Sequence, residues 1–542
     1  MRGLAWIVCV AVALLAAAAP AASYAARDGG EITISETLPP DFLDPALSYT
    51  VNGWEPMWLV YTPLLTYDHA EGAGGAKLIP ALAESLPQIL RGGRRYELRL
   101  RPGLRYSDGT PVKASDFEHA IKRVVNMESG GDAFFLGIKG ARRYHYGGRA
   151  GGDISGIRAD DATGTITIDL VAPDGTFSHE LAMLFAAPVP STTPFRDMTR
   201  APPPGVGPYR ITSSIPGREL VLERMRTFDV PGIPPGHVDK ITIRVMRSKA
   251  AQGRAVLDGT VDYMQDMPPP AIREEARRRG LYEEHPASST YYMFMNSRRP
   301  PFDDARVRRA VNYGVDKRAL VRVFEGNMRP GCSLLAPGVP GYSAALDQSG
   351  CPWGDPSRPP KLAKARRLIR AAGAVGAKVT VWGDDDDPTD DVTAAYARQL
   401  RRLGLDARAR IVDGGIYFQV IGNARTKAQT GFANWFEDFP HPYNFFFLVD
   451  GRTIQPNDNQ NFGNVDDPRI NRVLRVLKRE PTLSAHVVRR WAALDRRLVR
   501  AGHLFAYGHS IGSTFMSERM DIEHCSVFHP LFANDYSSWC LE

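Results

Sequence analysis

The sequence of 542 residues has little cysteine and few of the short motifs that mark catalytic or metal-binding chains. Its five cysteines form no CxxC pair and its twelve histidines no HExxH motif, so a zinc site of the usual spacing is not expected. It has no Walker A loop, which excludes ATP hydrolysis through a P-loop by this chain. Apart from the N-terminal segment, no apolar run is long enough to cross a membrane.

Charge is spread along the chain rather than gathered into blocks. Lysine and arginine total 67 and aspartate and glutamate 60, which gives a formal net charge of +7. Nucleic-acid binding requires a clustered basic patch, so nucleic acid is not an expected partner. A chain of 542 residues with 43% hydrophobic content is also too long for one core, so two or more domains are expected.

The N-terminus has the order of a secretory signal. One arginine precedes an uncharged, mostly apolar run over 4–19, and a proline and small residues follow it. This pattern predicts a signal peptide over 1–26 with cleavage after Ala25 or Ala26, and hence export to the periplasmic space or cell envelope. An uncleaved membrane anchor is the alternative, although the run is short for a span of about 20 residues. Cys9 lies in this run without the small-residue context of a lipid attachment site.

Four cysteines, Cys332, Cys351, Cys525 and Cys540, remain after such cleavage. An even number in an exported chain indicates disulfides. Three pairings are open, and sequence proximity favours Cys332–Cys351 and Cys525–Cys540 because each closes a short loop. Metal ligation is the alternative, but no cysteine–histidine cluster supports it.

One stretch in the middle of the chain predicts a strand followed by two helices. Residues 290–296 form a short apolar, aromatic run of strand type. Asp303 or Asp304 can then cap a helix whose apolar residues recur at helical spacing over 307–315. Asp316 can cap the second helix.

The second half alternates between strand and helix patterns. A strand over 378–382, a helix over 392–403 and a strand over 405–412 predict a βαβ unit, and so a parallel sheet with a right-handed crossover. Residues 384–387 are four consecutive aspartates, for which a solvated loop before a helix is favoured over a cation site. In the first half, the apolar residues over 54–65 predict a helix.

Three strings carry a more specific resemblance. SSTYYMFMNSRRPPFDDARVRRAVNYGVD over 288–316, LRPGLRYSDGTPVKASDFEHAIKRV over 100–124 and PPPGVGPYRI over 202–211 resemble the family 5 extracellular solute-binding proteins. These are the peptide- and nickel-type receptors of ABC importers. Gly314 and Tyr106 depart from the usual residues of that family, alanine and phenylalanine. The resemblance runs from about residue 30 to the C-terminus.

This resemblance implies an α/β, two-lobed periplasmic-binding-protein fold of the large peptide-receptor type. It implies lobe I over 27–70, 204–288 and 508–542, a subdomain inserted into lobe I over 71–203, and lobe II over 289–507. It further implies a monomer without cofactor or reaction, which captures peptides and delivers them to an ABC permease and its ATPase subunits. Nickel chelates, oligosaccharides and opine-like solutes stay open as ligands, because the fold is shared and the pocket varies.

The stretch GFANWFEDFPHPYNFF over 431–446 combines aromatic residues with two adjacent acids. A buried aromatic cluster with solvated acids explains it without a ligand. It also resembles a family string in which an aspartate pairs with the α-ammonium group of a peptide. The resemblance gives Asp438 that role and makes Trp435 an aromatic wall. Further ligand-binding candidates are Glu437, where the family has no fixed acid, and Tyr507, Tyr49 and Asn52, which align near the cleft.

A different class of function is suggested by residues 508–512, GHSIG, which match the G-x-S-x-G nucleophile elbow. A secreted serine hydrolase using Ser510 would need a helix after this motif, then an acid and a histidine, for which Asp521 and His524 or His529 are available. Only 30 residues follow the motif, too few for the strands that normally carry those groups, so a chance match is favoured.

Isolated histidines give the one route to metal binding. A nickel receptor of this family could recruit His441, His503 or His509. Single histidines are more often surface or packed residues, so we expect no metal site at these positions.

Overall fold

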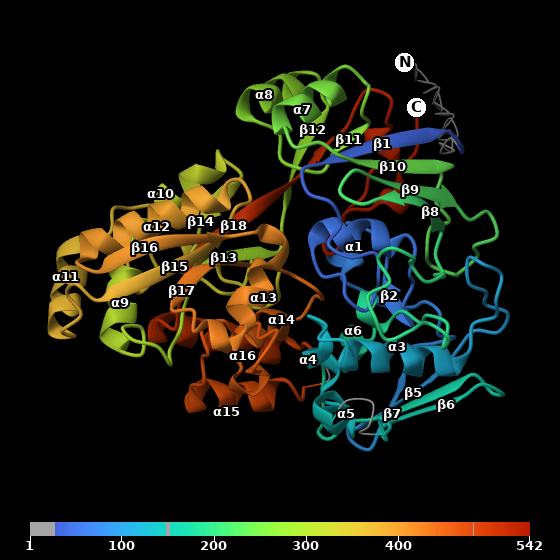
Figure 1. Ribbon diagram of the computed structural model, residues 1–542, viewed down its shortest axis with the longest axis horizontal. Coiled ribbons are helices and arrows are strands. Elements are labelled where there is room, and N and C mark those ends of the chain that lie inside the picture. The colour runs from blue at the N-terminus through green and yellow to red at the C-terminus, as the bar shows by residue number, and fades with distance from the viewer. Residues whose placement is uncertain (1–27, 148–151, 481) are drawn as a thin grey trace, which may run out of the picture.

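The computed structural model describes residues 28–147, 152–480 and 482–542. Figure 1 shows two lobes side by side, with both ends of the described chain in one of them. The α/β, two-lobed fold expected from the sequence is the fold observed. The predicted signal peptide, Cys9 and both expected cleavage positions lie outside the described residues. No helix of the described ranges is long and apolar enough to span a membrane.

Lobe I, on the right of Figure 1, is built on a five-stranded sheet in the order β11-β1-β10-β9-β8. β1 runs parallel to β10 and β11, while β9 is antiparallel to both β10 and β8. The buried Ile32 and Ile34 alternate along β1, as expected for a strand with one face in the core. The bounds are β1 Glu31–Glu36, β8 Tyr209–Ile215, β9 Glu219–Arg224, β10 Lys240–Val245 and β11 Tyr263–Met264.

A second sheet of lobe I lies within the segment expected to be an inserted subdomain. It is antiparallel, in the order β4-β5-β7-β6, and α3 packs beside it (Figure 1). The buried Phe117, Ile121 and Val124 recur on one face of α3, which therefore covers the core. The bounds are β4 Gln88–Leu90, β5 Arg95–Arg99, β6 Ile157–Asp160, β7 Thr165–Asp169 and α3 Ala114–Asn126.

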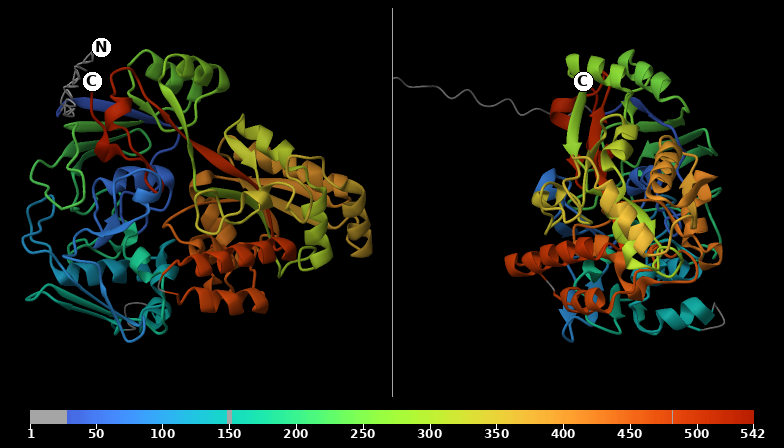
Figure 2. Two further views of the ribbon diagram at one scale, coloured as in Figure 1. Left: turned by 180° about the vertical axis from the view of Figure 1, so that it is seen from behind. Right: turned by 90° about the vertical axis from the view of Figure 1, so that its left-hand side faces the viewer.

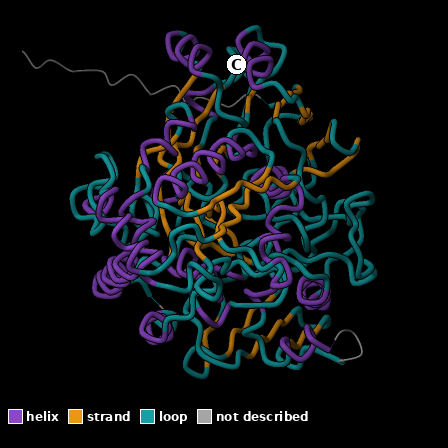
Figure 3. Tube along the Cα trace, turned by 60° about the vertical axis from the view of Figure 1, so that its left-hand side comes forward, coloured by secondary structure: helices purple, strands orange, loops and turns teal. Residues whose placement is uncertain are grey.

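Lobe II contains most of a seven-stranded sheet in the order β12-β18-β13-β17-β15-β16, with β14 paired to β18. Figure 3 shows helices around the central strands. The predicted βαβ unit is confirmed, because β15 and β16 are parallel in register from Lys378↔Asp406 to Asp384↔Val412 and α12 connects them. The bounds are β12 Tyr282–Pro286, β13 Ser289–Met295, β14 Met328–Pro330, β15 Lys378–Asp384, α12 Thr389–Leu403, β16 Asp406–Val412, β17 Thr430–Phe436 and β18 Leu504–Phe515.

The two lobes are joined by β12, β13 and β18. One half of β18 pairs with β13 inside lobe II, and the other half pairs with β12 as it leaves toward lobe I (Figure 2). A register shift between Tyr291 and Tyr292 falls where the two halves meet. The expected division at 507/508 lies inside β18, and the domain divisions as a whole stay a prediction.

The strand and helices expected in the middle of the chain are confirmed. β13 is followed by α9 and α10, and the side chains of Asp304 and Asp316 accept hydrogen bonds from the first turns of these two helices. The helix expected over 54–65 is wrong in extent. α1 ends at Trp58, because the next residues hydrogen-bond across the lobe, with the Leu59 carbonyl accepting from the Tyr209 N–H at 2.9 Å.

The remaining helices and short strands complete both lobes. The helices are α1 Val51–Trp58, α2 Gly72–Gly75, α4 Asp132–Phe135, α5 Ala141–Gly147, α6 Phe177–Glu180, α7 Lys249–Leu257, α8 Pro270–Arg278, α9 Ala305–Gly314, α10 Lys317–Val321, α11 Leu362–Ala371, α13 Tyr417–Gly422, α14 Pro442–Phe446, α15 Pro468–Leu477, α16 Ala485–Ala501 and α17 Ile522–Cys525. The strand pairs are β2 Leu65–Tyr67 with β3 Leu78–Pro80, and β19 Phe528–His529 with β20 Ala533–Asn534.

Both predicted disulfides are confirmed. Cys332 and Cys351 are bonded with Cα atoms 6.1 Å apart, and Cys525 and Cys540 with Cα atoms 5.6 Å apart. The first lies in lobe II, and the second joins the C-terminal segment to itself beside lobe I. Neither pair lies where the lobes meet.

Candidate functional site

The site is organised by the end of β17, where Trp435 is the penultimate strand residue. Trp435 pairs with Thr290 of β13, and its indole N–H donates to the Asn444 side-chain oxygen at 2.9 Å. Asn444 is fully buried on α14. The turn from β17 into α14 therefore fixes the plane of the tryptophan ring.

Asp438 lies in that turn and meets the other lobe. Its Oδ2 accepts from the Asn444 side-chain N–H at 2.8 Å and from the Tyr49 hydroxyl of lobe I at 3.2 Å. Its backbone N–H donates to the Asn444 side-chain oxygen at 3.0 Å. Burial raises the pKa of Asp438 to about 7, and the two side-chain hydrogen bonds only partly oppose this shift. The carboxyl group is thus held by neutral donors alone.

Tyr49 is positioned by the loop before α1. The Asp41 carboxylate accepts from the Tyr49 backbone N–H at 2.7 Å, and the Thr50 side chain caps α1. The Tyr49 ring meets the Trp435 ring edge-on, with centroids 6.1 Å apart. It also contacts Phe185 and Trp54, at 5.1 and 5.6 Å between centroids. Aromatic rings from both lobes therefore enclose the Asp438 carboxyl group.

Glu437 is the second acid of the site. Its side chain is 9% exposed, and its Oε1 has no hydrogen-bond partner among the described residues. Its backbone N–H donates to the Ser288 carbonyl at 2.9 Å, beside the junction of β12 and β13. Burial raises the pKa of Glu437 to about 8, the Ser288 side chain lowers it, and the neighbouring Asp438 raises it further. No ion pair within the described ranges involves Glu437 or Asp438.

Lobe I contributes two further residues that the sequence did not single out. The Tyr67 hydroxyl lies 2.8 Å from His179 Nδ1, and the His179 ring stacks near the Phe439 ring with centroids 5.8 Å apart. Burial lowers the pKa of His179 to about 4, so this imidazole is neutral. Burial raises the pKa of Tyr67 well above its ordinary value, and the charges of Glu437 and Asp438 raise it further. Neither residue belongs to a string that resembles the family, so no sequence signal marked them.

Two sequence candidates are not brought to this site. Asn52 donates to the Glu36 carboxylate, the Leu38 carbonyl and the Gln265 side chain inside lobe I. Tyr507 packs near the rings of Tyr291 and Phe324, at 6.3 and 6.5 Å.

The position of Tyr507 has a simple cause. Successive strand residues point to opposite faces of a sheet, and Trp435 pairs with Thr290, the neighbour of Tyr291. Tyr507, which packs with Tyr291, therefore lies over the opposite face from Trp435. Of the six candidates, Tyr49, Trp435, Glu437 and Asp438 come together.

The G-x-S-x-G motif does not form a nucleophile elbow. Ser510 lies within β18, which continues to Phe515 without the turn and helix that an elbow needs. The Ser510 hydroxyl lies 2.5 Å from the Ser289 hydroxyl of β13. Asp521 and His524 contact each other at 3.0 Å on the segment that follows.

The three histidines considered for metal binding are separated in the fold. His441 caps α14 with its Nδ1, His503 lies 3.2 Å from Asp467, and His509 lies 3.1 Å from Asp347. Over the described part of the chain, the one group of three close ligand atoms is Asp521, Cys525 and Cys540. Its two cysteines are bonded to each other, so their sulfur atoms are not thiolate ligands.

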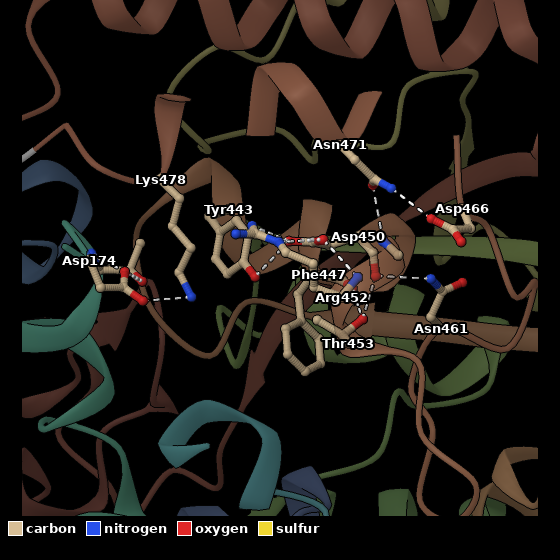
Figure 4. Close-up of polar contacts among 12 residues, drawn as sticks. Asp174, Tyr443, Phe447, Asp450, Arg452, Thr453, Asn461, Asp466, Asn471 and Lys478 are labelled. Atoms are coloured by element: carbon tan, nitrogen blue, oxygen red, sulfur yellow. Dashed lines mark hydrogen bonds and ion pairs between the residues drawn. The ribbon is translucent and has the colours of Figure 1, made fainter. Parts of the chain in front are cut away.

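A second contact between the lobes lies beyond the aromatic layer. Figure 4 shows Lys478 and Asp174 pointing toward one another, with Nζ 2.7 Å from Oδ2. Glu180 Oε1 is 3.6 Å from the same Nζ, which also lies 4.2 Å from the centre of the Tyr443 ring. Burial acts to lower the pKa of Lys478, but Asp174, Tyr443 and Glu180 raise it well above its ordinary value. This contact joins α15 of lobe II to the segment before α6 of lobe I.

A cavity of about 220 Å³ adjoins this lysine. It is lined from both lobes, by residues around α4 and α6 and by residues of α14 and α15. The space is separated from Asp438 by aromatic side chains, since Phe447 lines it and also contacts the Trp435 ring at 6.1 Å.

Comparisons with known proteins match the middle of the chain by sequence and nearly all of it by fold. The sequence model described as bacterial extracellular solute-binding proteins, family 5 Middle, matches residues 77–457. The glutathione-binding protein GsiB of Escherichia coli O1:K1 / APEC is 27% identical over 346 residues, 62% of each chain. The chain thus matches less than two thirds of the length of such curated relatives.

Solved structures extend the similarity to nearly the full length. Clavulanic acid biosynthesis oligopeptide binding protein 2 is 28% identical with a TM-score of 0.81, covering 95% of this chain and 96% of that one. The Haemophilus influenzae OppA complex with RPPGFSPFR has a TM-score of 0.77 at 16% identity, over 95% of this chain and 100% of that one, and so shows the fold alone. Because the family model covers well over half of the sequence, the chain belongs to the family 5 bacterial extracellular solute-binding proteins.

Proposed function

We propose that this protein is an exported receptor that captures peptides between its lobes and delivers them to an ABC permease driven by ATPase subunits. The observation that carries the proposal is Asp438, a carboxyl group at the lobe interface without a cationic partner among the described residues. Family membership and the peptide-binding names of the structural relatives support it. The receptor acts as a monomer and catalyses no reaction of its own.

In this proposal, Asp438 binds the α-ammonium group of the peptide and Trp435 packs beside it. A carboxylate enclosed by aromatic rings is poorly hydrated, so a charge-assisted hydrogen bond to –NH₃⁺ offsets the cost of burying it. When the lobes close on a peptide, its ammonium group takes the position beside Asp438 that the Tyr49 hydroxyl of lobe I occupies in this structure. Tyr49 and Trp435 then remain as facing aromatic walls.

Capture would proceed by closure of the lobes about β12, β13 and β18. Only these strands would bend. The parts that move as rigid bodies would be lobe I over 27–70, 204–288 and 508–542, together with its inserted subdomain over 71–203, and lobe II over 289–507. Hinge motion of this kind is a common way for two-lobed proteins to enclose a ligand. Small-angle scattering on ligand-stripped protein, with and without saturating peptide, tests it, and an unchanged radius of gyration at saturation contradicts it.

Calorimetry on a four-way cycle tests the anchoring role. Asp438→Asn keeps the shape of the side chain and removes its charge, so peptide affinity should fall at least about 30-fold, within the roughly 2–5 kcal/mol expected for truncating a buried charge pair. N-acetylation of the peptide should weaken binding to the wild-type protein by a comparable factor and have little further effect in the variant. Additive losses would show that Asp438 does not contact the amine.

The same measurement separates the other ligand classes. Glutathione, a nickel chelate, an oligosaccharide and an opine-like compound are titrated alongside the free-amine peptides. Binding of one of these with no binding of peptides would replace the peptide proposal within the same receptor class. Ester hydrolysis by the wild-type protein that is lost in Ser510→Ala would instead establish the hydrolase.

A further inference from the structure

The site contains two adjacent acids, the buried Glu437 and the half-buried Asp438, and no basic side chain of the described residues forms an ion pair with either. Glu437 is 9% exposed and its Oε1 has no partner, while Asp438 is held only by the neutral groups of Asn444 and Tyr49. Buried charges in proteins are normally paired, and a buried unpartnered carboxyl oxygen requires an explanation. The family resemblance gives a role to Asp438 but none to Glu437, because the family has no fixed acid at the position of Glu437.

The acids face the lobe interface rather than the interior of lobe II. The charges of both groups contribute to raising the pKa of Tyr67, a residue of β2 in lobe I. The Ser288 hydroxyl is the one neighbouring donor that lowers the pKa of Glu437. Opening of the lobes therefore exposes both carboxyl groups to the same space.

Within the described part of the chain, no basic side chain forms an ion pair with either acid. The pKa of His179 is lowered to about 4 by burial, and burial also lowers that of His441 well below its ordinary value. Lys478, the other cation near this interface, is held by Asp174 and Glu180. A ligand with one positive charge would pair with one acid and leave the second acid without a cation.

Resting on the proposed function, we propose that the site selects ligands with two positive charges on their first residue, as in peptides that begin with lysine or arginine. The α-ammonium group binds Asp438 and the side-chain cation binds Glu437. The rings of Tyr67 and Phe439 both lie beside the His179 ring, with centroids 5.9 and 5.8 Å from it, and such aromatic faces favour a cation over a neutral chain. Glu437 thereby determines the specificity of a site that Asp438 anchors.

The test compares tripeptides that differ in one charge. Calorimetry on ligand-stripped protein uses Lys-Ala-Ala, norleucine-Ala-Ala and Ala-Lys-Ala, since norleucine keeps the length of the lysine chain without its charge. We expect Lys-Ala-Ala to bind at least 10-fold more tightly than the other two. Glu437→Gln should abolish this preference by lowering the affinity for Lys-Ala-Ala to that for norleucine-Ala-Ala, whereas the control Glu283→Gln, which removes an exposed acid of β12, should keep the preference.

A second readout is the release of protons on binding. Burial raises the pKa of Glu437 to about 8 and that of Asp438 to about 7, and a dication favours the ionised forms of both acids. Lys-Ala-Ala should therefore release more protons than norleucine-Ala-Ala when the enthalpy is measured in buffers of different ionisation heat. The Glu437→Gln variant should release equal numbers with both peptides. A purely structural role of Glu437 would not produce this difference.

The possible failures are distinguishable. Equal affinities for Lys-Ala-Ala and norleucine-Ala-Ala in the wild-type protein, or a preference that persists in Glu437→Gln, overturns the role of Glu437 and leaves the peptide receptor standing. Absence of binding by all three peptides overturns the proposed function itself.

Discussion

Two of the contacts between the lobes contain a pair of acids, and they differ in whether a cation is present. At one contact, Asp174 and Glu180 meet Lys478, which is itself enclosed. At the other, Asp438 and Glu437 meet only tyrosine, asparagine and serine. At the first contact the protein itself supplies both the acids and the cation, so this contact holds the two lobes together without a ligand. The second is incomplete, and its missing charge is the best indication of what the ligand supplies.

The comparison predicts opposite effects of removing charge at the two contacts. Lys478→Met leaves Asp174 and Glu180 without a cation and should lower the free energy of unfolding by roughly 3–5 kcal/mol, the usual cost of breaking a buried pair from one side. Asp438→Asn removes an acid that lacks a cation, so the stability of the ligand-free protein should rise.

Chemical denaturation of both variants measures these changes. Arg479→Met is the matched control for Lys478→Met, because the adjacent arginine is exposed and forms no ion pair among the described residues. A loss of stability in Asp438→Asn would mean that its hydrogen bonds to Asn444 and Tyr49 outweigh the cost of its burial.

Removing one disulfide should lower the stability of the protein without changing either of the two contacts between the lobes. Replacing Cys525 and Cys540 with alanine should lower the free energy of unfolding by about 2–4 kcal/mol, since the bridge closes a loop with a sequence separation of 15. Peptide affinity should stay the same, because the bridge lies away from the lobe interface. A large change in affinity would show that the C-terminal segment contributes to the site.

The unpaired acids also predict a pH dependence of stability. The folded-state pKa values of Asp438 and Glu437, about 7 and 8, lie above the unfolded values of about 3.9 and 4.3, so the folded state binds more protons in this range. Their stabilising contribution is therefore full below pH 4 and is lost as the pH rises through 7 and 8.

The difference between the wild-type protein and an Asp438→Asn/Glu437→Gln variant isolates this effect. The double variant should become the more stable protein as the pH rises from 4 to 8, by several kcal/mol at the upper end. Thermal unfolding of ligand-free samples across this range measures it. A constant difference between the two proteins would show that the acids are not buried in the free state.

The smallest effect is expected at a third, exposed contact between the lobes. Lys249 of α7 lies 3.1 Å from Asp387, but the two side chains are 26% and 75% exposed. Lys249→Ala should therefore change the free energy of unfolding by less than about 1 kcal/mol, and less at high salt. If Lys249→Ala lowers the free energy of unfolding as much as Lys478→Met does, then solvent exposure does not determine how much each contact stabilises the protein.

The side of the site contributed by lobe II could be predicted because it is one continuous string. Trp435, Glu437 and Asp438 lie within a few residues of each other, so a short resemblance contained all of them. The turn into α14 then fixes their geometry through Asn444, which the resemblance did not mark. Local sequence and local structure agree in this region.

The side contributed by lobe I could be predicted only in part. Tyr49 was found through alignment near the cleft, but Tyr67, His179 and Phe185 come from separate segments that only the folded lobe brings together. Tyr507 was misplaced because the sequence does not reveal which face of a strand a residue occupies beside an irregular register. The helix over 54–65 was overextended for a similar reason, since hydrogen bonds to distant residues ended it early.

The position of β18 in the chain constrains the order in which the protein can fold. This strand lies between β13 and β12 in the sheet, yet it begins at Leu504, long after β13 ends at Met295. A growing chain can form β13, β17 and the βαβ unit, but the edge of β13 that pairs with β18 stays unpaired until residues 504–508 have been made. Contacts this distant in sequence form slowly, and unpaired strand edges favour aggregation. The sheet of lobe II can therefore be completed only after the last part of the chain has been made.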